Sequence, residues 1–265
     1  MTGIERINNC FTGRAARKKC LAAFLTAGDP DLTVSETYCR AALQHVDLLE
    51  IGLPFSDPMA DGPVIQAAYK RTLSAGTRLG DIFAMAQRLR TTTEKPILFM
   101  VYLNIILQRG LVRFLQEAAD SGVDGLIVPD LPPEEADEIL GMAHQRGLGL
   151  VFLVAPTSTD ERIKLAAVKS TGFLYCVSLR GVTGVRTKLG TDLPEFIQRV
   201  RTSTDLPLMV GFGISGPEQV RQVTAIADGA IVGSALVKLL AEGEDRDENL
   251  RKLGEFLSAL KKAAE

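Results

Sequence analysis

A regular alternation between short apolar runs and helical patterns is the feature that most constrains the fold of this chain. Strands are expected at the apolar runs 20–26, 46–51, 96–102, 125–128, 149–154, 173–177, 207–210 and 229–232. Helices are expected at 32–44, 64–74, 79–90, 111–121, 134–146, 160–169 and 193–202, after Ser215 and Pro217, and at about 249–263. The strands are apolar throughout rather than alternating, which indicates a parallel sheet covered by helices.

Eight strand–helix units in 265 residues have the size of a closed (β/α)₈ TIM barrel. A doubly wound open sheet is the alternative, but no Gly-x-Gly-x-x-Gly follows the first strand. We expect an extra N-terminal helix at 4–11 that closes the bottom of the barrel, and an extra helix after the second strand, where 64–74 and 79–90 are both helical. No long low-complexity linker interrupts the pattern, so the prediction is a single TIM-barrel domain over residues 1–265.

Charge and cysteine usage exclude several kinds of partner and site. The net charge is -2 and the acids and bases are interleaved, so the chain has no electrostatic footprint for nucleic acid or a membrane. The longest uncharged runs have 13 residues, fewer than the ~18 of a membrane span, and no signal peptide is apparent, so a cytoplasmic location is expected. Four widely spaced cysteines and two histidines predict neither a disulfide framework nor a metal site.

Glu50 stands at the end of an apolar strand, where folding gains nothing from a charge. A buried, ionised carboxylate without a partner costs several kcal/mol. By strand alternation Glu50 shares a face with Val46 and Leu48, and in a barrel that face can place it in the mouth, where active sites lie. Desolvation there should raise its pKa and make it a proton donor or acceptor. The alternative is a strand-end residue paired with a lysine.

The loop that follows carries three prolines and two further acids, Asp57 and Asp61. Its stiffness could hold Asp61 over the end of the strand. Two carboxylates in different environments can divide the roles of acid and base. Since Asp before Gly or Pro is common in turns, a turn role is favoured for Asp57 and stays open for Asp61.

Glycine-bearing turns at 181–184, 211–215 and 233–235 follow the last three strands. Backbone N–H groups of such turns, a helix N-terminus and a serine hydroxyl can cradle an anion. Phosphate sites after the seventh and eighth strands are frequent in these barrels. The three turns together predict a phosphate there, with the reacting centre near the second strand, and therefore a substrate larger than a triose.

Apolar and aromatic side chains are expected to line the mouth between these two ends. The strand-end candidates are Phe24, Met100, Tyr102, Ile127, Phe152 or Leu153, and Phe212. Ordinary barrel core is the alternative for most of them. Tyr175, which has a hydroxyl to satisfy, is more typical of a pocket. The loop 179–191, with Arg180, Arg186 and Lys188, is a candidate lid.

Over essentially its whole length the chain resembles the alpha subunit family of tryptophan synthase. The segment 50–63 is similar to the family's signature and is specific enough to name the family almost by itself. Matching segments in the same order and at comparable spacing are 24–30, 102–104, 181–184, 211–215 and 233–235. The departures at 129–130 and 179–180 are small and touch no assigned role.

The resemblance implies a barrel that cleaves indole-3-glycerol phosphate to indole and glyceraldehyde 3-phosphate, a retro-aldol lyase step in tryptophan biosynthesis. Glu50 would be the acid–base group at indole C3 and at the glycerol hydroxyl, and Asp61 would accept the indole N–H. Tyr175 would support the catalytic group, and Thr183 would hold Asp61 in position. The implied phosphate ligands are Gly184, Gly213, Gly233 and Ser234.

The resemblance also implies a partner, the beta subunit of tryptophan synthase, in an assembly of two alpha and two beta subunits. No cofactor or metal is expected in this chain, and pyridoxal phosphate is expected only in the beta subunit. Docking would involve the loop 54–61 and the region of Asn104 and Gln108, since Ile106, Leu107 and the loop around Phe55 are too apolar for a free surface. Partner binding would then move Asp61 and switch the lyase.

Two other functions remain open from the sequence. One is a different phosphosugar barrel, such as an epimerase or isomerase, but those that use a metal need histidines at strand ends, and none stands there. The other is a catalytically silent barrel that binds indole or phosphate compounds and activates a partner enzyme. The intact pair of Glu50 and Asp61 argues against it.

Overall fold

The chain folds around a parallel sheet that closes on itself. The structure, a computed structural model, describes residues 1–12, 19–177, 192–211, 213–243 and 245–265. Its strand order is β5-β4-β3-β2-β1-β9-β8-β7-β6. The two strands at the ends of that order, β5 (Gly149–Val151) and β6 (Leu153–Val154), are separated in the chain by Phe152 alone. They are therefore two halves of one strand, and the sheet is the predicted TIM barrel.

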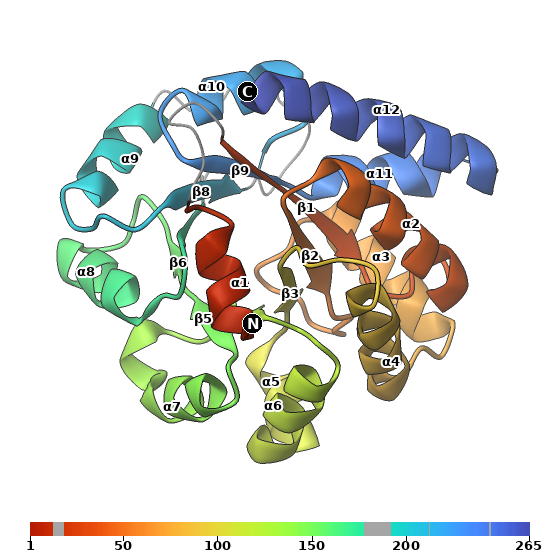
Figure 1. Cartoon of the computed structure of the whole chain (residues 1–265), viewed down its shortest axis with the longest axis horizontal. Helices are drawn as coiled ribbons and strands as arrows, with labels where there is room; N and C mark the ends of the chain where they lie inside the picture. The colour runs from red at the N-terminus through yellow and green to blue at the C-terminus, as the bar shows by residue number, and fades with distance from the viewer. Residues whose placement is uncertain (13–18, 178–191, 212, 244) are drawn as a thin grey trace.

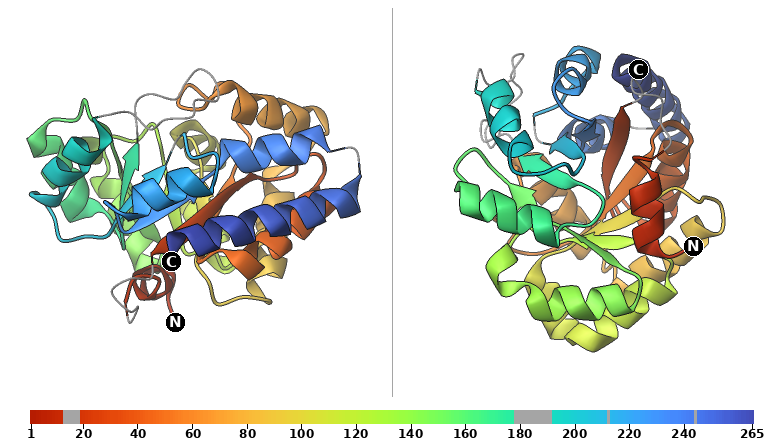
Figure 2. Two further views of the ribbon diagram at one scale, coloured as in Figure 1. Left: turned by 90° about the horizontal axis from the view of Figure 1, so that it is seen from above. Right: turned by 60° about the vertical axis from the view of Figure 1, so that its left-hand side comes forward.

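The remaining strands form the ring, and the helices surround it (Figure 1). The strands are β1 (Cys20–Thr26), β2 (Leu48–Gly52), β3 (Ile97–Met100), β4 (Gly125–Ile127), β7 (Leu174–Val177), β8 (Leu208–Gly211) and β9 (Gly229–Val232). The helices are α1 (Gly3–Asn9), α2 (Leu32–His45), α3 (Pro63–Ser74), α4 (Leu79–Arg90), α5 (Leu103–Arg109), α6 (Leu111–Asp120), η1 (Pro133–Glu135), α7 (Asp137–Gln145), α8 (Asp160–Lys169), α9 (Leu193–Arg201), α10 (Pro217–Thr224), α11 (Ser234–Glu242) and α12 (Arg246–Ala264). Figure 2 shows the same ring of helices from two further directions.

Each strand divides its side chains between the barrel interior and the surrounding helices. The register places Phe24 beside Glu50 and Glu50 beside Leu98, so these three side chains share one face. Phe24 and Leu98 belong to the smaller of two buried apolar clusters, which is the interior of the barrel. The alternate positions, such as Leu49 and Ile51, belong to the larger cluster beneath the helices. Because both faces are buried, the strands are apolar throughout.

Helix α1 lies across one end of the ring (Figure 1) and closes it with Ile7. Ile7 is fully buried, and its side chain occupies the space where Gly125, Gly149 and Gly172 have no side chain of their own. A Cβ at Gly172, whose φ is +78°, would stand 2.2 Å from Ile7 Cγ2. Because Gly125 and Gly149 begin β4 and β5, this is the N-terminal end of the barrel, as predicted for the extra N-terminal helix.

Most predicted elements agree with the structure, and four have the predicted bounds: β1, α4, α8 and β9. The second strand begins at Leu48 rather than Val46, because the Val46 N–H still bonds to Ala42 O and completes α2. Helix α5 is not among the predicted elements, since its seven residues are too few to show helical periodicity. Its first N–H, of Leu103, donates to the Asp130 carboxylate at 2.9 Å.

Other elements also differ from the prediction: α1 ends at Asn9, β3 ends at Met100, and α12 begins at Arg246. The helix predicted at 134–146 is divided into η1 and α7, and for α11 only a turn that leads toward a helix was predicted.

The four cysteines are buried and form no disulfide. None of the helices in the described part of the chain is long and apolar enough to cross a membrane.

The insertion of Ile7 predicts that α1 contributes strongly to stability. Ile7→Ala removes a fully buried side chain and leaves a cavity that the glycines around it cannot fill, so the free energy of unfolding should fall by about 2–5 kcal/mol. Urea unfolding followed by circular dichroism measures this. The matched control is Val168→Ala on α8, because Val168 is 83% exposed. Equal unfolding midpoints for the two variants would contradict the role of Ile7.

Candidate active site

Glu50 is the third residue of β2 and points into the barrel. Its side chain is fully buried, and neither carboxylate oxygen has a hydrogen-bond partner. No lysine pairs with it in the described part of the chain, so the alternative of a strand-end ion pair is not what the structure has. Burial raises the pKa of Glu50 to about 8. The carboxyl is thus largely protonated near neutral pH and able to donate or accept a proton.

Asp61 lies in the loop between β2 and α3 and is 2% exposed. The Tyr102 hydroxyl donates to Asp61 Oδ2 at 2.7 Å, and the Ala60 N–H donates to the Tyr102 oxygen at 3.1 Å. The ring of Phe55 stacks on Tyr102 with centroids 4.9 Å apart. Burial raises the pKa of Asp61 to about 6, and the hydrogen bond from Tyr102 opposes that rise. Asp61 is therefore largely ionised at neutral pH, unlike Glu50.

Asp57 has the turn role favoured from the sequence. It is exposed, and its carboxylate accepts the Ser56 hydroxyl at 2.6 Å. Tyr102, by contrast, has a contact that sequence analysis did not foresee: it holds Asp61. The sequence does contain an indication of this contact. Tyr102 follows the strand next to β2, and its side chain therefore lies at the same rim of the barrel as the loop that carries Asp61.

Tyr175 on β7 lies close to both carboxyl groups. Burial raises its pKa well above the usual value, and the charges of Glu50 and Asp61 raise it further. Its hydroxyl lies over Gly211, since a Cβ there would be 2.3 Å from the Tyr175 oxygen. The glycine at the end of β8 thus makes room for a phenol in the mouth. Glu50, Asp61 and Tyr175, predicted from separate parts of the sequence, are brought together at one end of the barrel.

The apolar candidates Phe24, Met100 and Ile127 lie in the interior cluster. Phe24 extends toward β2, because a Cβ at Gly52 would stand 2.3 Å from its Cζ. On the other side a Cβ at Gly233 would stand 3.2 Å from Phe24 Cβ. Two strand-end glycines therefore leave the space that the Phe24 side chain occupies beside Glu50.

The predicted phosphate ligands are partly described. Gly213 follows β8 with a φ of +81°, and Ser234 begins α11 directly after β9, with Gly233 as the residue before the helix. Both positions are at the C-terminal ends of their strands, where backbone N–H groups of a helix start can face an anion. The other predicted residues here lie outside the described residues: Thr183, Gly184 and Phe212, and the lid with Arg180, Arg186 and Lys188.

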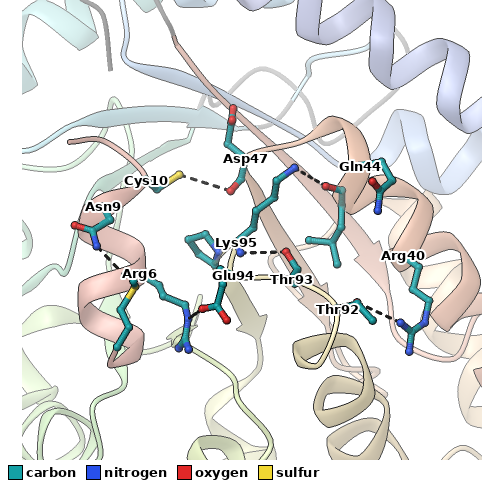
Figure 3. A pocket seen from close by; sticks show the side chains of 13 residues that line it. Arg6, Asn9, Cys10, Arg40, Gln44, Asp47, Thr92, Thr93, Glu94 and Lys95 are labelled. Carbon is teal, nitrogen blue, oxygen red and sulfur yellow. Dashed lines mark hydrogen bonds and ion pairs between the residues drawn. The ribbon is translucent and has the colours of Figure 1, made fainter. Parts of the chain in front are cut away.

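A pocket at the opposite end of the barrel is shown in Figure 3. It lies between α1, α2 and residues 92–96, which precede β3, and its charged side chains are engaged with neighbours. Arg6 pairs with Glu94 at 3.0 Å, and Asp47 pairs with Lys261. The N-terminal end of a barrel serves stability rather than chemistry. In the described part of the chain no three His, Cys, Asp or Glu side chains gather as a metal site.

Comparison with known proteins agrees with this arrangement. The family model described as tryptophan synthase alpha chain matches residues 11–265. A tryptophan synthase alpha chain from a Geobacter species is 47% identical over 260 residues, 97% of this chain and 97% of that protein. One from Caldanaerobacter subterraneus is 44% identical over 245 residues, 92% of this chain and 93% of that protein.

Solved structures give the same result. The tryptophan synthase alpha chain of Legionella pneumophila has a TM-score of 0.89 and 37% identity, and the match covers 100% of this chain and 97% of that one. A chain of the tryptophan synthase complex from Pyrococcus furiosus has a TM-score of 0.85 and 37% identity, over 92% of this chain and 98% of that one. Because sequence and fold agree over nearly the whole length, the chain belongs to the tryptophan synthase alpha chain family.

Proposed function

We propose that this chain is a lyase that cleaves indole-3-glycerol phosphate to indole and glyceraldehyde 3-phosphate by a retro-aldol reaction in tryptophan biosynthesis. The observation that carries this proposal is the pair of buried carboxyl groups at one end of the barrel, with pKa values raised by burial to about 8 for Glu50 and about 6 for Asp61. At neutral pH the first is mainly an acid and the second mainly a carboxylate. Membership of the family supplies the substrate.

Each carboxyl group has a separate task in this reaction. Glu50 gives its proton to C3 of the indole ring, which leaves a positive charge on the ring nitrogen. Asp61 accepts the N–H hydrogen bond and stabilises that charge, and Tyr102 keeps Asp61 oriented. The Glu50 carboxylate then removes the proton of the adjacent glycerol hydroxyl. As the C–C bond breaks, its electron pair returns to the ring, indole leaves, and Glu50 is protonated again.

The other site residues bind and position the substrate. Tyr175 supports Glu50 from β7, and Phe24, Met100 and Ile127 pack against the flat ring from within the barrel. Gly213, Gly233 and Ser234 bind the phosphate, together with Gly184, which lies outside the described residues as Thr183 and Phe212 do.

The beta subunit of tryptophan synthase is the protein partner, in an assembly of two alpha and two beta subunits. Met59, in the loop after β2, is 91% exposed, and Leu107, in α5 after β3, is 57% exposed. Ile106, expected on the same surface, is instead buried in the core. Apolar groups at the rim of the active site suit a surface that a partner covers.

Pyridoxal phosphate belongs to the beta subunit, and this chain works without a cofactor. The location is cytoplasmic. A silent barrel that only activates a partner is not favoured, because a buried Glu50 without a hydrogen-bond partner costs stability and is explained only by a role in catalysis.

Replacing Glu50 tests the acid–base role directly. Glu50→Gln keeps the shape of the side chain and removes its proton transfer, so release of indole from indole-3-glycerol phosphate should fall by about 100- to 10,000-fold. Turnover of the purified chain is followed through the appearance of indole. The control is Glu138→Gln, an exposed glutamate on α7, which should leave turnover unchanged. Substantial residual turnover in Glu50→Gln, with the control active, would refute the role.

The two raised pKa values predict a bell-shaped pH dependence of kcat/KM. Glu50 must be protonated to act as the acid, so activity should fall as the pH rises through about 8. Asp61 must be ionised to accept the indole N–H, so activity should also fall as the pH drops through about 6. Asp61→Asn should be slower and lose the acidic limb while it keeps the basic one. An unchanged acidic limb in that variant would assign the limb to another group.

Partner binding should raise the rate of this lyase. A coupling of typical strength corresponds to a rise of about 5- to 150-fold on addition of the beta subunit. Leu107→Glu places a charge on the exposed apolar surface and should raise the beta-subunit concentration needed for half-maximal stimulation. Val168→Glu, on the outer helix α8, is the matched control and should behave as the unaltered chain. Equal titration curves for both variants would remove Leu107 from the contact.

A further inference from the structure

Tyr69 on α3 is buried, and its hydroxyl makes no hydrogen bond within the described part of the protein. The residue is 0% exposed, and its hydroxyl has no hydrogen-bond partner. Other buried tyrosines are different: Tyr38 accepts from Asn249 at 3.2 Å, and Tyr102 donates to Asp61 at 2.7 Å. A buried hydroxyl without a partner costs stability, whereas a phenylalanine of the same shape does not. Packing therefore explains the Tyr69 ring but not its oxygen.

The Tyr69 oxygen lies inside the barrel, beside the C-terminal end of β2. A Cβ at Gly52 would stand 2.8 Å from that oxygen, on the side where it also meets the tip of the Phe24 ring. Gly52 is two residues beyond Glu50 on β2, and residues two apart on a strand face the same side. The hydroxyl thus lies near the tip of the Phe24 ring, on the face of β2 from which Glu50 projects.

The hydroxyl needs an acceptor. Burial raises the pKa of Tyr69 well above its usual value, and the charge of Asp61 raises it further, so the phenol keeps its proton. Asp61 is near enough to affect Tyr69, yet its hydrogen bond comes from Tyr102. A second hydroxyl on this side, that of Thr26, is also buried without a partner, and Thr26 stands beside Gly52 in the strand register. Two unsatisfied hydroxyls indicate that this wall of the mouth meets a polar, oxygen-bearing group.

We propose that Tyr69 is a further substrate-contacting residue, whose hydroxyl donates a hydrogen bond to an oxygen of the substrate's glycerol chain. This inference rests on the proposed function, which supplies a substrate with that chain. The indole ring meets Asp61 and the phosphate meets the turns after β8 and β9, so the hydroxyl-bearing carbons lie between them, near Glu50. The Tyr69 hydroxyl, which reaches from α3 to the Glu50 face of β2, is placed to orient these carbons for cleavage.

The test is Tyr69→Phe, which removes one oxygen atom and keeps the ring. The melting temperature of the free chain should stay the same or rise, because an unsatisfied hydroxyl is removed. The kcat/KM for indole-3-glycerol phosphate should fall by about 2- to 10-fold, the effect of one neutral hydrogen bond. An analogue that keeps the indole and the phosphate but has hydrogen in place of the glycerol hydroxyls should bind equally well to both proteins.

Tyr38→Phe is the matched control, because its hydroxyl accepts a hydrogen bond from Asn249 on α12. This variant should melt at a lower temperature and keep its kcat/KM. The inference is overturned if Tyr69→Phe lowers the melting temperature as Tyr38→Phe does, if kcat/KM is unchanged, or if the analogue binds more weakly to Tyr69→Phe. Absence of indole release from the unaltered chain would instead refute the proposed function, so the two failures can be told apart.

Discussion

The burial of Glu50 without a partner is the constraint on which the site depends. Removal from water raises the pKa of Glu50 from its usual 4.5 to about 8, so the folded chain holds this proton more tightly than the unfolded chain does. The resulting contribution to stability is complete below the unfolded pKa near 4.5 and is lost as the pH rises through about 8. Near neutral pH the carboxyl is thus a ready acid, and only a strongly packed scaffold can keep it there.

That scaffold is the barrel, and its glycines make the cavity. Gly52 and Gly233 leave room for the Phe24 ring, and Gly211 leaves room for the Tyr175 hydroxyl. A Cβ at Gly52 or Gly211 would collide with an aromatic group that forms the floor or wall of the mouth, and one at Gly233 would press against Phe24. The apolar floor in turn keeps water from Glu50 and so maintains its raised pKa.

The barrel and the position of Glu50 could be predicted from the sequence. Barrel strands are recognised by their apolar runs, and a charged residue at the end of such a run is unusual. Glu50 was found in that way, and the proline-rich loop indicated Asp61. Tyr69 was not found, since helical periodicity predicts that its side chain is buried but not that its oxygen is unsatisfied. The contact of Tyr102 with Asp61 also needs the structure, because it joins two loops through side-chain rotamers. Short elements such as α5 have too few residues to show their period.

Two fully buried acids show how the barrel separates stability from chemistry. The carboxylate of Asp124, at the N-terminal end, accepts hydrogen bonds from the Arg6 guanidinium at 3.0 Å and from the Ile97 N–H at 2.7 Å. It also forms an ion pair with Arg90. Glu50, at the other end and equally buried, receives no such donor. A carboxylate with several donors ties α1, α4 and the start of β3 together, whereas one without donors stores a proton for transfer. The same residue chemistry therefore stabilises one end of the barrel and makes the other end reactive, and the difference lies in the donors that surround it.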